Sequence, residues 1–450
     1  MVGLAATRRL PWYGWVGLAG LLGGEIGLLA GIQGVRILFY CIAWWSYILL
    51  ADGLAWRRRG ESLLRTRPWE FLVLAFWSIA LWNIFELINF RLQNWFYINV
   101  PLQVAQAAVY SFFAYATVLP GIFETYDLLR AYGVGDGWRM RPWRIRPTGL
   151  AACVAVGLAM LLAPLLWPRY AFPLIWGFAV FLLDPVCYLS RRVPSFLAQF
   201  ERGDPRPFLR LLLAGLICGG LWEFWNHWAY TKWLYTVPYF EDAKWFEMPP
   251  LGFLGFPPFA LECYVLVNVL TLFRRGRGWE GAPAGPGAPR RLAVAGVVLA
   301  IGFNLAVYAG IERLTVESFA PSIADLRDVP RETVERLAAV GIASPPEFLR
   351  RTATPGQLEA LAGRSGIPAA ALGELRQAME LVDLKGLGAR NYRVLSRLGV
   401  RSVEALARQE PEALHQAWRA SPASRVPPAP RLRVWVRAAH RAAGSSAPGR

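Results

Sequence analysis

The sequence predicts an all-α protein: a polytopic membrane bundle of about nine helical spans, followed by a small soluble α-helical domain. Three observations support this fold class. First, 55% of the 450 residues are hydrophobic, which is too much for a soluble protein of this size. Second, long apolar stretches fill the chain to about residue 310, and charged residues become abundant only afterwards. Third, a set of polar and aromatic residues occurs twice within the apolar part, which indicates an internal duplication.

Nine stretches are long and apolar enough to cross a bilayer. They are 11–31, 37–55, 69–91, 102–127, 148–167, 171–189, 207–229, 251–273 and 292–310. The first has no small-residue cleavage site after it, so we expect a retained helix rather than a signal peptide. Arginine-rich loops alternate with loops rich in Trp and Tyr, and the positive-inside rule places the arginines in the cytoplasm. We therefore expect a bacterial inner-membrane protein with a cytoplasmic N-terminus and an extracytoplasmic C-terminal domain.

The duplication is defined by ten residues that recur in the same order at an offset of roughly 132 to 138 positions. The first copy has Trp44, Asp52, Glu86, Asn89, Trp95, Tyr97, Pro101, Pro120, Glu124 and Tyr126, and the second has Trp176, Asp184, Glu223, Asn226, Trp233, Tyr235, Pro238, Pro258, Glu262 and Tyr264. The copies lie four spans apart, so we expect one orientation and an axis along the membrane normal. The predicted repeats cover residues 1–136 and 137–280, and residues 281–321 hold the ninth span and a linker.

The repeated glutamates are the candidate catalytic residues, because polar groups inside hydrocarbon are costly and commonly functional. They are Glu86, Glu223, Glu262 and Glu124. An acid at such depth is kept neutral or hydrogen-bonded, and a neutral acid can donate a proton. The candidate ligand-binding residues are Asn89, Asn226, His227, Tyr126, Tyr264, Trp82 and Trp222. The alternative is structural: such pairs can hold helices together, and His227 can be a hydrogen-bonded structural residue rather than a proton relay.

Other repeated residues have simpler interpretations. Arginines follow Asp52 and Asp184 closely, so we expect interfacial ion pairs there. The aromatic pairs of the outer loops, at 95, 97, 233 and 235, fit an interfacial anchoring belt. The five cysteines share no metal-ligand spacing, so we expect no disulfide, no metal site and no cofactor.

Residues 322–420 contain a second, shorter duplication at an offset of 58. Asp325–Pro330 followed by Gly341-Ile342 matches Asp383–Gly388 followed by Gly399-Val400. The copy with Gly386 and Gly388 resembles a helix-hairpin-helix motif, and the region resembles a small bacterial family of uncharacterised tandem helix-hairpin-helix domains. In such motifs glycines let backbone amides approach a phosphate. The first copy has Asp328 and Pro330 at these positions, so we expect no phosphate there.

Residues 421–450 are rich in Pro, Ala, Ser and Arg, with no periodic apolar face. We therefore expect a disordered basic tail.

The repeated acids carry a further resemblance. Each copy has a helix ending in Leu and Asp before arginines, then a helix with an acid near its outer end, then a helix with Pro and Glu. The stretches are Leu49-Leu50-Ala51-Asp52 with Arg57–Arg59, Glu86 and Pro120…Glu124, and Leu182-Leu183-Asp184 with Arg191 and Arg192, Glu223 and Pro258…Glu262. This arrangement resembles the lycopene cyclase domain of membrane carotenoid cyclases, which has one more acid on its third helix. The resemblance implies an isoprenoid-handling fold that protonates a double bond without redox change.

Four functions remain open. The first is binding of a long apolar ligand, such as a carotenoid, quinone or prenyl lipid, between the copies. An enzyme of this kind is a cofactor-independent isoprenoid cyclase or isomerase using the buried glutamates. The second is a non-enzymatic scaffold or sensor that binds a protein partner through the helix-hairpin-helix pair. The third is a proton-coupled transporter, against which stands the lack of a predicted pair of broken half-helices. Nucleic-acid binding is disfavoured, because one intact hairpin without interleaved aromatics is a weak signal.

Overall fold

The computed structural model describes residues 8–101, 104–239, 243–274, 278–280, 289–423 and 425–445. The chain is mainly helical, as predicted, and eight segments in this part are long and apolar enough to cross a membrane. They are Gln33–Arg59, Pro68–Leu92, Ala105–Ala131, Pro147–Leu166, Pro168–Ser190, Arg206–Trp228, Pro250–Leu272 and Arg290–Leu314. Each corresponds to one of the spans expected from the sequence.

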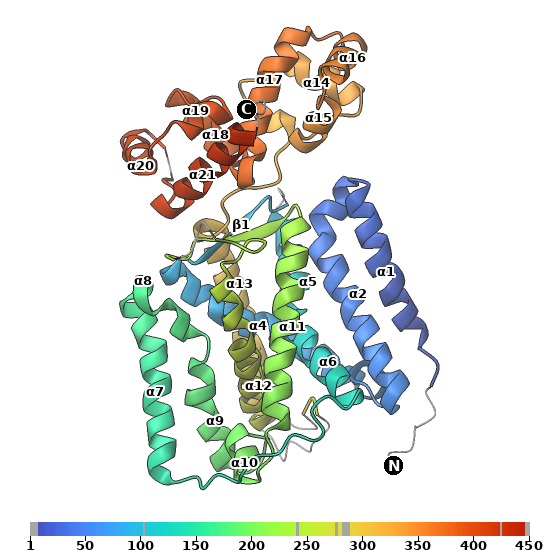
Figure 1. Ribbon diagram of the computed structural model, residues 1–450, viewed down its shortest axis with the longest axis vertical. Helices are drawn as coiled ribbons and strands as arrows, with labels where there is room; N and C mark the ends of the chain where they lie inside the picture. Colours follow the sequence, from blue (N-terminus) through green and yellow to red (C-terminus); the bar gives the residue numbers. More distant parts are fainter. Residues whose placement is uncertain are drawn as a thin grey trace. The chain divides into compact units, whose positions relative to one another are not determined.

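The first expected span, 11–31, is a helix but is not among these eight. This helix, α1 (Trp12–Leu29), contains Glu25 and six glycines, which lower its hydropathy. It packs beside α2 (Gln33–Arg59), as Figure 1 shows. A Cβ at Gly17 would lie only 2.7 Å from the backbone nitrogen of Leu50. The glycines therefore allow a close approach of the two helix backbones, as in many membrane helix pairs.

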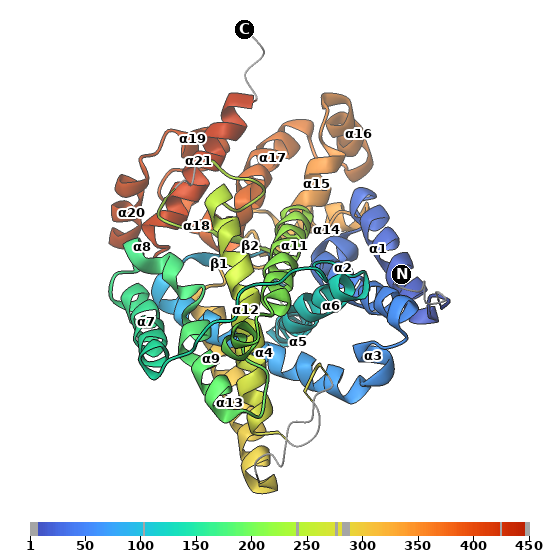
Figure 2. The ribbon, with the colours of Figure 1, turned by 60° about the horizontal axis from the view of Figure 1, so that its bottom comes forward.

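The remaining bundle is built from long helices joined by short ones. Its elements are α3 (Leu63–Thr66), α4 (Pro68–Leu92), α5 (Val104–Tyr115), α6 (Val118–Ala131), α7 (Pro147–Leu166), α8 (Pro168–Ala171), η1 (Phe172–Ile175), α9 (Phe178–Ser190), α10 (Phe196–Glu201), α11 (Arg206–Trp228), η2 (Pro250–Gly255), α12 (Phe256–Leu272) and α13 (Arg290–Leu314). Helices α2, α6, α11 and α12 pack in succession, and α9 joins them beside α12. In Figure 2, α7 lies at the rim next to α9.

Burial separates inner from outer helices. In α7 and α13 only 11% of the apolar window is buried, against 44% or more in the other candidate spans. These two helices therefore leave most of their apolar surface uncovered by the rest of the described chain. The polar candidate residues lie on the inner helices α4, α6, α11 and α12.

A second compact unit combines the chain from Val316 onward with segments of both outer loops, Trp95–Ala107 and Tyr230–Thr236. The loops contribute strands β1 (Trp95–Ile98) and β2 (Lys232–Tyr235), which pair antiparallel. The expected interfacial aromatics are thus members of a sheet. The register pairs Trp95 with Tyr235 and Tyr97 with Trp233, so equivalent residues exchange partners.

The rest of this unit is helical. Its elements are η3 (Ile323–Asp325), α14 (Arg331–Ala339), α15 (Pro345–Arg351), α16 (Pro355–Ser365), α17 (Ala369–Asp383), η4 (Leu384–Gly386), α18 (Gly388–Arg397), α19 (Val403–Ala407), α20 (Pro411–Ala420) and α21 (Ala429–Ser445). Their buried leucines and valines, with Phe348, Trp418 and Trp435, form one hydrophobic core.

The expectation of a disordered tail after residue 421 is wrong for most of its length. Residues 429–445 form α21, and Leu432, Trp435, Val436 and Ala439 are buried in the core of this unit. These positions follow an i, i+3, i+4, i+7 pattern, which is an amphipathic helix with arginines on its other face. Residues 446–450 lie outside the described part of the chain.

Candidate functional site

Glu86 is fully buried in α4 and accepts a hydrogen bond from a tryptophan one turn earlier. The indole Nε1 of Trp82 donates to Oε1 of Glu86 at 2.9 Å. The spacing of four residues places both side chains on one helix face. Asn89, also fully buried, has a different task, since its Oδ1 accepts from the backbone amide of Asn94 at 2.9 Å. Asn89 therefore helps to end α4, and Glu86 remains as the candidate for chemistry on this face.

In α11, Glu223 and Asn226 are likewise fully buried. His227 follows them in the last turn of the helix, and its Nδ1 lies 3.7 Å from the carboxylate of Glu247 in the following loop. Its ring also packs against the rings of Trp228 and Phe246. These contacts orient His227 toward the loop, as expected of a structural histidine.

Glu262 of α12 is buried, and its carboxylate contacts the first turn of another helix, α9, which follows a break. Its Oε1 accepts a hydrogen bond from the backbone amide of Ala179, in the first turn of α9, at 3.0 Å. The segment Pro168–Ser190 is interrupted just before α9, where Gly177 has φ of 140°. Free amides at a helix N-terminus favour a carboxylate. The amide that holds Glu262 is therefore available because the helix is broken there.

The segments that carry Glu124 and Glu262 are also each divided. Residues 105–131 consist of α5 and α6, with a break at Ala116 and Thr117, and residues 250–272 consist of η2 and α12. The sequence predicted no pair of Gly/Pro-broken half-helices at a midplane site, and it gave no sign of the breaks within these segments. The sequence concealed these breaks because Pro120, Pro257 and Pro258 lie in the first turns of their helices, where proline is tolerated.

Aromatic rings from the two expected repeats contact one another. We call this set the aromatic seam; it consists of Trp82, Phe85, Trp176, Trp222 and Phe259. The centroid of Phe259 lies 5.1 Å from Phe85, 5.7 Å from Trp176, 5.9 Å from Trp82 and 6.0 Å from Trp222. Phe85 and Trp176 are stacked, with centroids 5.5 Å apart and planes inclined by 12°. Trp82 and Phe85 belong to the first copy and the other three rings to the second.

The seam brings two predicted acids into one neighbourhood. Phe85 directly precedes Glu86, and Phe259 lies one turn before Glu262. Phe85, Trp222 and Phe259 are buried, whereas Trp82 and Trp176 are half-buried and form the accessible edge of the seam. The predicted residues Trp82, Trp222, Glu86 and Glu262 are thus associated with one cluster, and Phe85, Trp176 and Phe259 complete it. In the sequence Trp176 was noted only as a member of the repeat, and Phe85 and Phe259 were hidden among the many apolar aromatics.

Glu124, Tyr126 and Tyr264 belong to a second cluster, at the arginine-rich ends of the helices. Trp279 stacks on Phe123, with centroids 4.3 Å apart, and its ring contacts Tyr126 and Tyr264. Trp279 therefore lies between the two equivalent tyrosines of the copies. Nothing in the sequence distinguished it except that a tryptophan is unusual within an arginine-rich loop.

Charges surround this second cluster. Glu124 is buried, and its electrostatic neighbours are Asp52, Asp127 and Arg67. Glu280, in the loop after α12, has its pKa raised to about 7, mainly by desolvation, and Arg130 opposes this shift. Glu124 is therefore placed among charged groups, unlike Glu86 and Glu262, which border aromatic rings.

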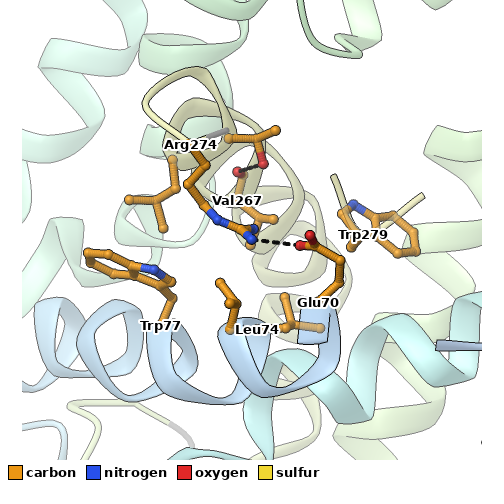
Figure 3. Close-up of a pocket in the computed structure, with 9 residues that line it drawn as sticks. Glu70, Leu74, Trp77, Val267, Arg274 and Trp279 are labelled. Atoms are coloured by element: carbon orange, nitrogen blue, oxygen red, sulfur yellow. Dashed lines mark hydrogen bonds and ion pairs between the residues drawn. The ribbon is translucent and has the colours of Figure 1, made fainter. Parts of the chain in front are cut away.

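A small hollow opens beside this cluster, between α4 and α12 (Figure 3). An ion pair between Arg274 and Glu70, 2.7 Å long, crosses it, and Trp77 and Trp279 flank the pair on opposite sides. None of the predicted site residues lines this hollow. The ion pair instead joins the start of α4 to the end of α12.

Asp52 and Asp184 do not form the expected arginine ion pairs. Asp52 accepts from the hydroxyl of Tyr13 at 2.6 Å and from the amide of Leu64 at 2.7 Å. Asp184 accepts from the amides of Phe196 and Leu197 at 2.8 and 2.9 Å. Each aspartate thus binds the N-terminus of the short helix that follows it, where amides lack intrahelical partners.

Comparison with known families gives one match. A family profile described as a domain of unknown function (DUF4332) matches residues 327–441. Neither curated proteins nor solved structures give any match to the chain. The matched segment includes most of α21, in agreement with its packing in the core of the C-terminal unit. The C-terminal unit is therefore similar to DUF4332 over residues 327–441, and the lycopene cyclase resemblance rests on the motifs of the bundle alone.

Proposed function

We propose that the helical bundle binds a long apolar ligand of the isoprenoid type along the aromatic seam. One observation carries this proposal: rings from both copies form a continuous cluster that has a buried carboxylic acid beside it in each copy. Glu86 adjoins Phe85 in α4, and Glu262 follows Phe259 in α12. Apolar sites with a few fixed polar groups are typical of small-molecule binding.

The half-buried edge of the aromatic seam is the position that we propose for the ligand. Trp82 and Trp176 are partly accessible and both contact Phe259. A flat polyene or prenyl chain packs well against such ring faces. The indole of Trp82 also donates to Glu86, so a ligand lying on this ring reaches the acid.

The chemistry that fits is redox-neutral proton transfer. A neutral Glu86 or Glu262 donates its proton to a carbon–carbon double bond, whose π electrons form the new C–H bond. The resulting cation is stabilised by the faces of the surrounding rings. The cation cyclises onto a neighbouring double bond or keeps its skeleton, and loss of a different proton to the carboxylate regenerates the acid. The product is an isomer of the substrate, and no cofactor takes part. Glu223 is the equivalent acid of α11 and is proposed as a third proton-carrying group.

We also infer that the two halves of the bundle arose by duplication and face the same way. The reciprocal pairing of Trp95 with Tyr235 and of Tyr97 with Trp233 supports a two-fold relation between the halves. Asp52 and Asp184 each accept a hydrogen bond from the short helix that follows, and this equivalence supports the two-fold relation as well. With the arginine-rich loops in the cytoplasm, β1 and β2 lie outside. A reporter fused after Ser445 is expected to be extracytoplasmic, and a cytoplasmic signal would contradict this topology.

The test of ligand binding is extraction of the purified protein with organic solvent, followed by absorption spectra and mass spectrometry. We expect the wild type to release an isoprenoid and Trp82→Ala to release at least fivefold less. Trp69→Ala is the matched control, since Trp69 lies on the same helix but is 70% exposed. A wild-type extract without isoprenoid, from cells that make such compounds, would overturn the proposal.

Proton-coupled transport is a second candidate, favoured by one observation. The amide at the start of α9, behind the break at Gly177, binds the buried Glu262. Transporters use such half-helix ends at their binding sites. In proteoliposomes with an internal pH dye, proton flux that Glu262→Gln abolishes would favour transport over ligand chemistry.

A further inference from the structure

The two hairpin glycines that resemble a phosphate site are covered by the chain itself. Gly386 and Gly388 have φ of 66° and 73°, a conformation that favours glycine. A Cβ at Gly386 would clash with the side chain of Ile98 in β1, and one at Gly388 would lie 2.7 Å from the Cβ of Ser318. The close approach that such glycines permit is therefore used by protein segments and not by a phosphate.

The segment after α13 pairs through isolated bridges with β1 and the residues that follow it. The amides of Glu317 and Ala320 donate to the carbonyls of Tyr97 and Val100 at 2.8 and 2.7 Å. The amide of Val100 donates in return to the carbonyl of Ser318 at 3.1 Å. Tyr97 bridges Val316 and Val100 bridges Phe319 in parallel register. The chain that enters the C-terminal helices is thus paired along β1.

Glu317 ties this segment to the C-terminal helices. Its carboxylate is 1% exposed and pairs with Arg431 of α21, which is 3% exposed. Asn391 of α18 donates to the same carboxylate at 3.1 Å, and the guanidinium of Arg425 lies 3.8 Å away. Arg431 also lies over the ring of Phe96 in β1, 4.7 Å from its centroid. A buried acid that serves several partners in this way is costly to leave unpaired.

The second outer loop is held as well. The hydroxyl of Tyr230 donates to Asp383, at the end of α17, at 3.2 Å. Asn99 donates through Nδ2 to the carbonyl of Tyr230, and Thr231 donates back to the carbonyl of Asn99. Leu234 of β2 shares a small core with Phe96 and Ile98, against which Val434 packs.

We propose that the C-terminal helices form an intramolecular clamp whose partner is the pair of loops that carry β1 and β2, within the same compact unit. Its second hairpin binds a protein strand in place of a phosphate, and Glu317 is the centre of the attachment. The clamp thereby fixes β1 and β2, which follow α4 and α11 within a few residues along the chain. The clamp does not depend on the isoprenoid proposal and can be tested without a ligand.

The test is hydrogen exchange of the full-length protein in detergent, read by mass spectrometry. In Glu317→Ala we expect at least tenfold faster exchange in peptides covering 95–101 and 316–320, whose amides make this pairing. Peptides from the core of α16 and α17 should be unchanged, which shows that the helices remain folded. Glu412→Ala is the matched control, because it removes an exposed ion pair with Arg433 in the same unit.

A second variant guards against general unfolding. Ile98→Asp places a charge against Gly386 without altering any residue of the C-terminal helices, and it should give the same local acceleration. Unchanged exchange at 316–320 in both variants would overturn the clamp. Binding of a short DNA duplex to the wild type at physiological salt would overturn it too, because the hairpin glycines would then have to be free.

Discussion

The bundle and the C-terminal unit differ in where their large apolar side chains lie. Among the described residues, the exposed large apolar side chains all lie between Trp12 and Leu314. In the C-terminal unit, leucines and tryptophans of this kind are inside and arginines cover the surface. One chain therefore combines a part with apolar side chains on its surface and a part with apolar side chains inside, and the change occurs within a few residues of Thr315.

The buried acids of the two regions also differ, in the kind of group that donates hydrogen bonds to them. Glu317 is paired with the guanidinium of Arg431, which is a charged donor. Glu86 and Glu262 accept hydrogen bonds from the indole of Trp82 and the amide of Ala179, which are neutral donors. Removing the partner of a buried ion pair costs more free energy than removing a neutral hydrogen bond. The comparison therefore separates the acid of the clamp from the acids proposed for chemistry.

The largest effect is expected in the core of the C-terminal unit. Trp435→Ala removes a fully buried ring from α21, and we expect a loss of about 4 kcal/mol in the free energy of unfolding. Urea unfolding followed by tryptophan fluorescence measures it. His440→Ala, on the exposed face of the same helix, should change it by less than about 0.5 kcal/mol. Equal effects of the two substitutions would mean that α21 does not belong to the core.

An effect of intermediate size on the free energy of unfolding should distinguish an acid paired with a cation from an acid bound by a neutral donor. Glu317→Gln leaves Arg431 without its charged partner, and we expect a loss of about 3 kcal/mol. Glu86→Gln keeps an acceptor for Trp82, so we expect a loss below about 1 kcal/mol, together with loss of any proton chemistry. Thermal unfolding in detergent, compared at equal protein concentration, measures both. A larger loss for Glu86→Gln would assign that acid a charged, structural role.

The smallest effect concerns the arginine-rich side of the bundle. Hydrogen bonds from Arg206 hold the pKa of Asp204 below its usual value. An acid with a lowered folded-state pKa contributes stability above its unfolded pKa of about 3.9, and this contribution is lost as pH falls through the folded value. Since the pair is partly exposed, Asp204→Asn should cost no more than about 1 kcal/mol at pH 7. The difference from wild type should vanish near pH 2, and a constant difference from pH 7 to pH 2 would argue against the ion pair.

The helices and the buried acids could be predicted from the sequence, because both depend on the free energy of placing local groups in hydrocarbon. A run of about 20 apolar residues has few stable alternatives to a membrane helix, and an acid within it is conspicuous. The sequence did not predict contacts in which the partner of a residue comes from a distant segment of the chain. The pairing of Tyr97 with Trp233, the insertion of Trp279 and the bond from Ala179 to Glu262 all depend on tertiary structure. The apolar face of α21 was overlooked because arginines and alanines between Leu432 and Ala439 mask its period.

The crossed pairing of the outer loops has a consequence for biosynthesis. Tyr97 leaves the ribosome well before Trp233, its partner in the sheet, and Val316 follows later still. At a synthesis rate of roughly 5–20 residues per second, β1 waits on the order of 10 s for β2. During this interval a hydrophobic strand edge is exposed, which is the kind of surface that associates with other chains. The pairing of β1 is therefore completed only after the later segments that contain Trp233 and Val316 have been synthesised.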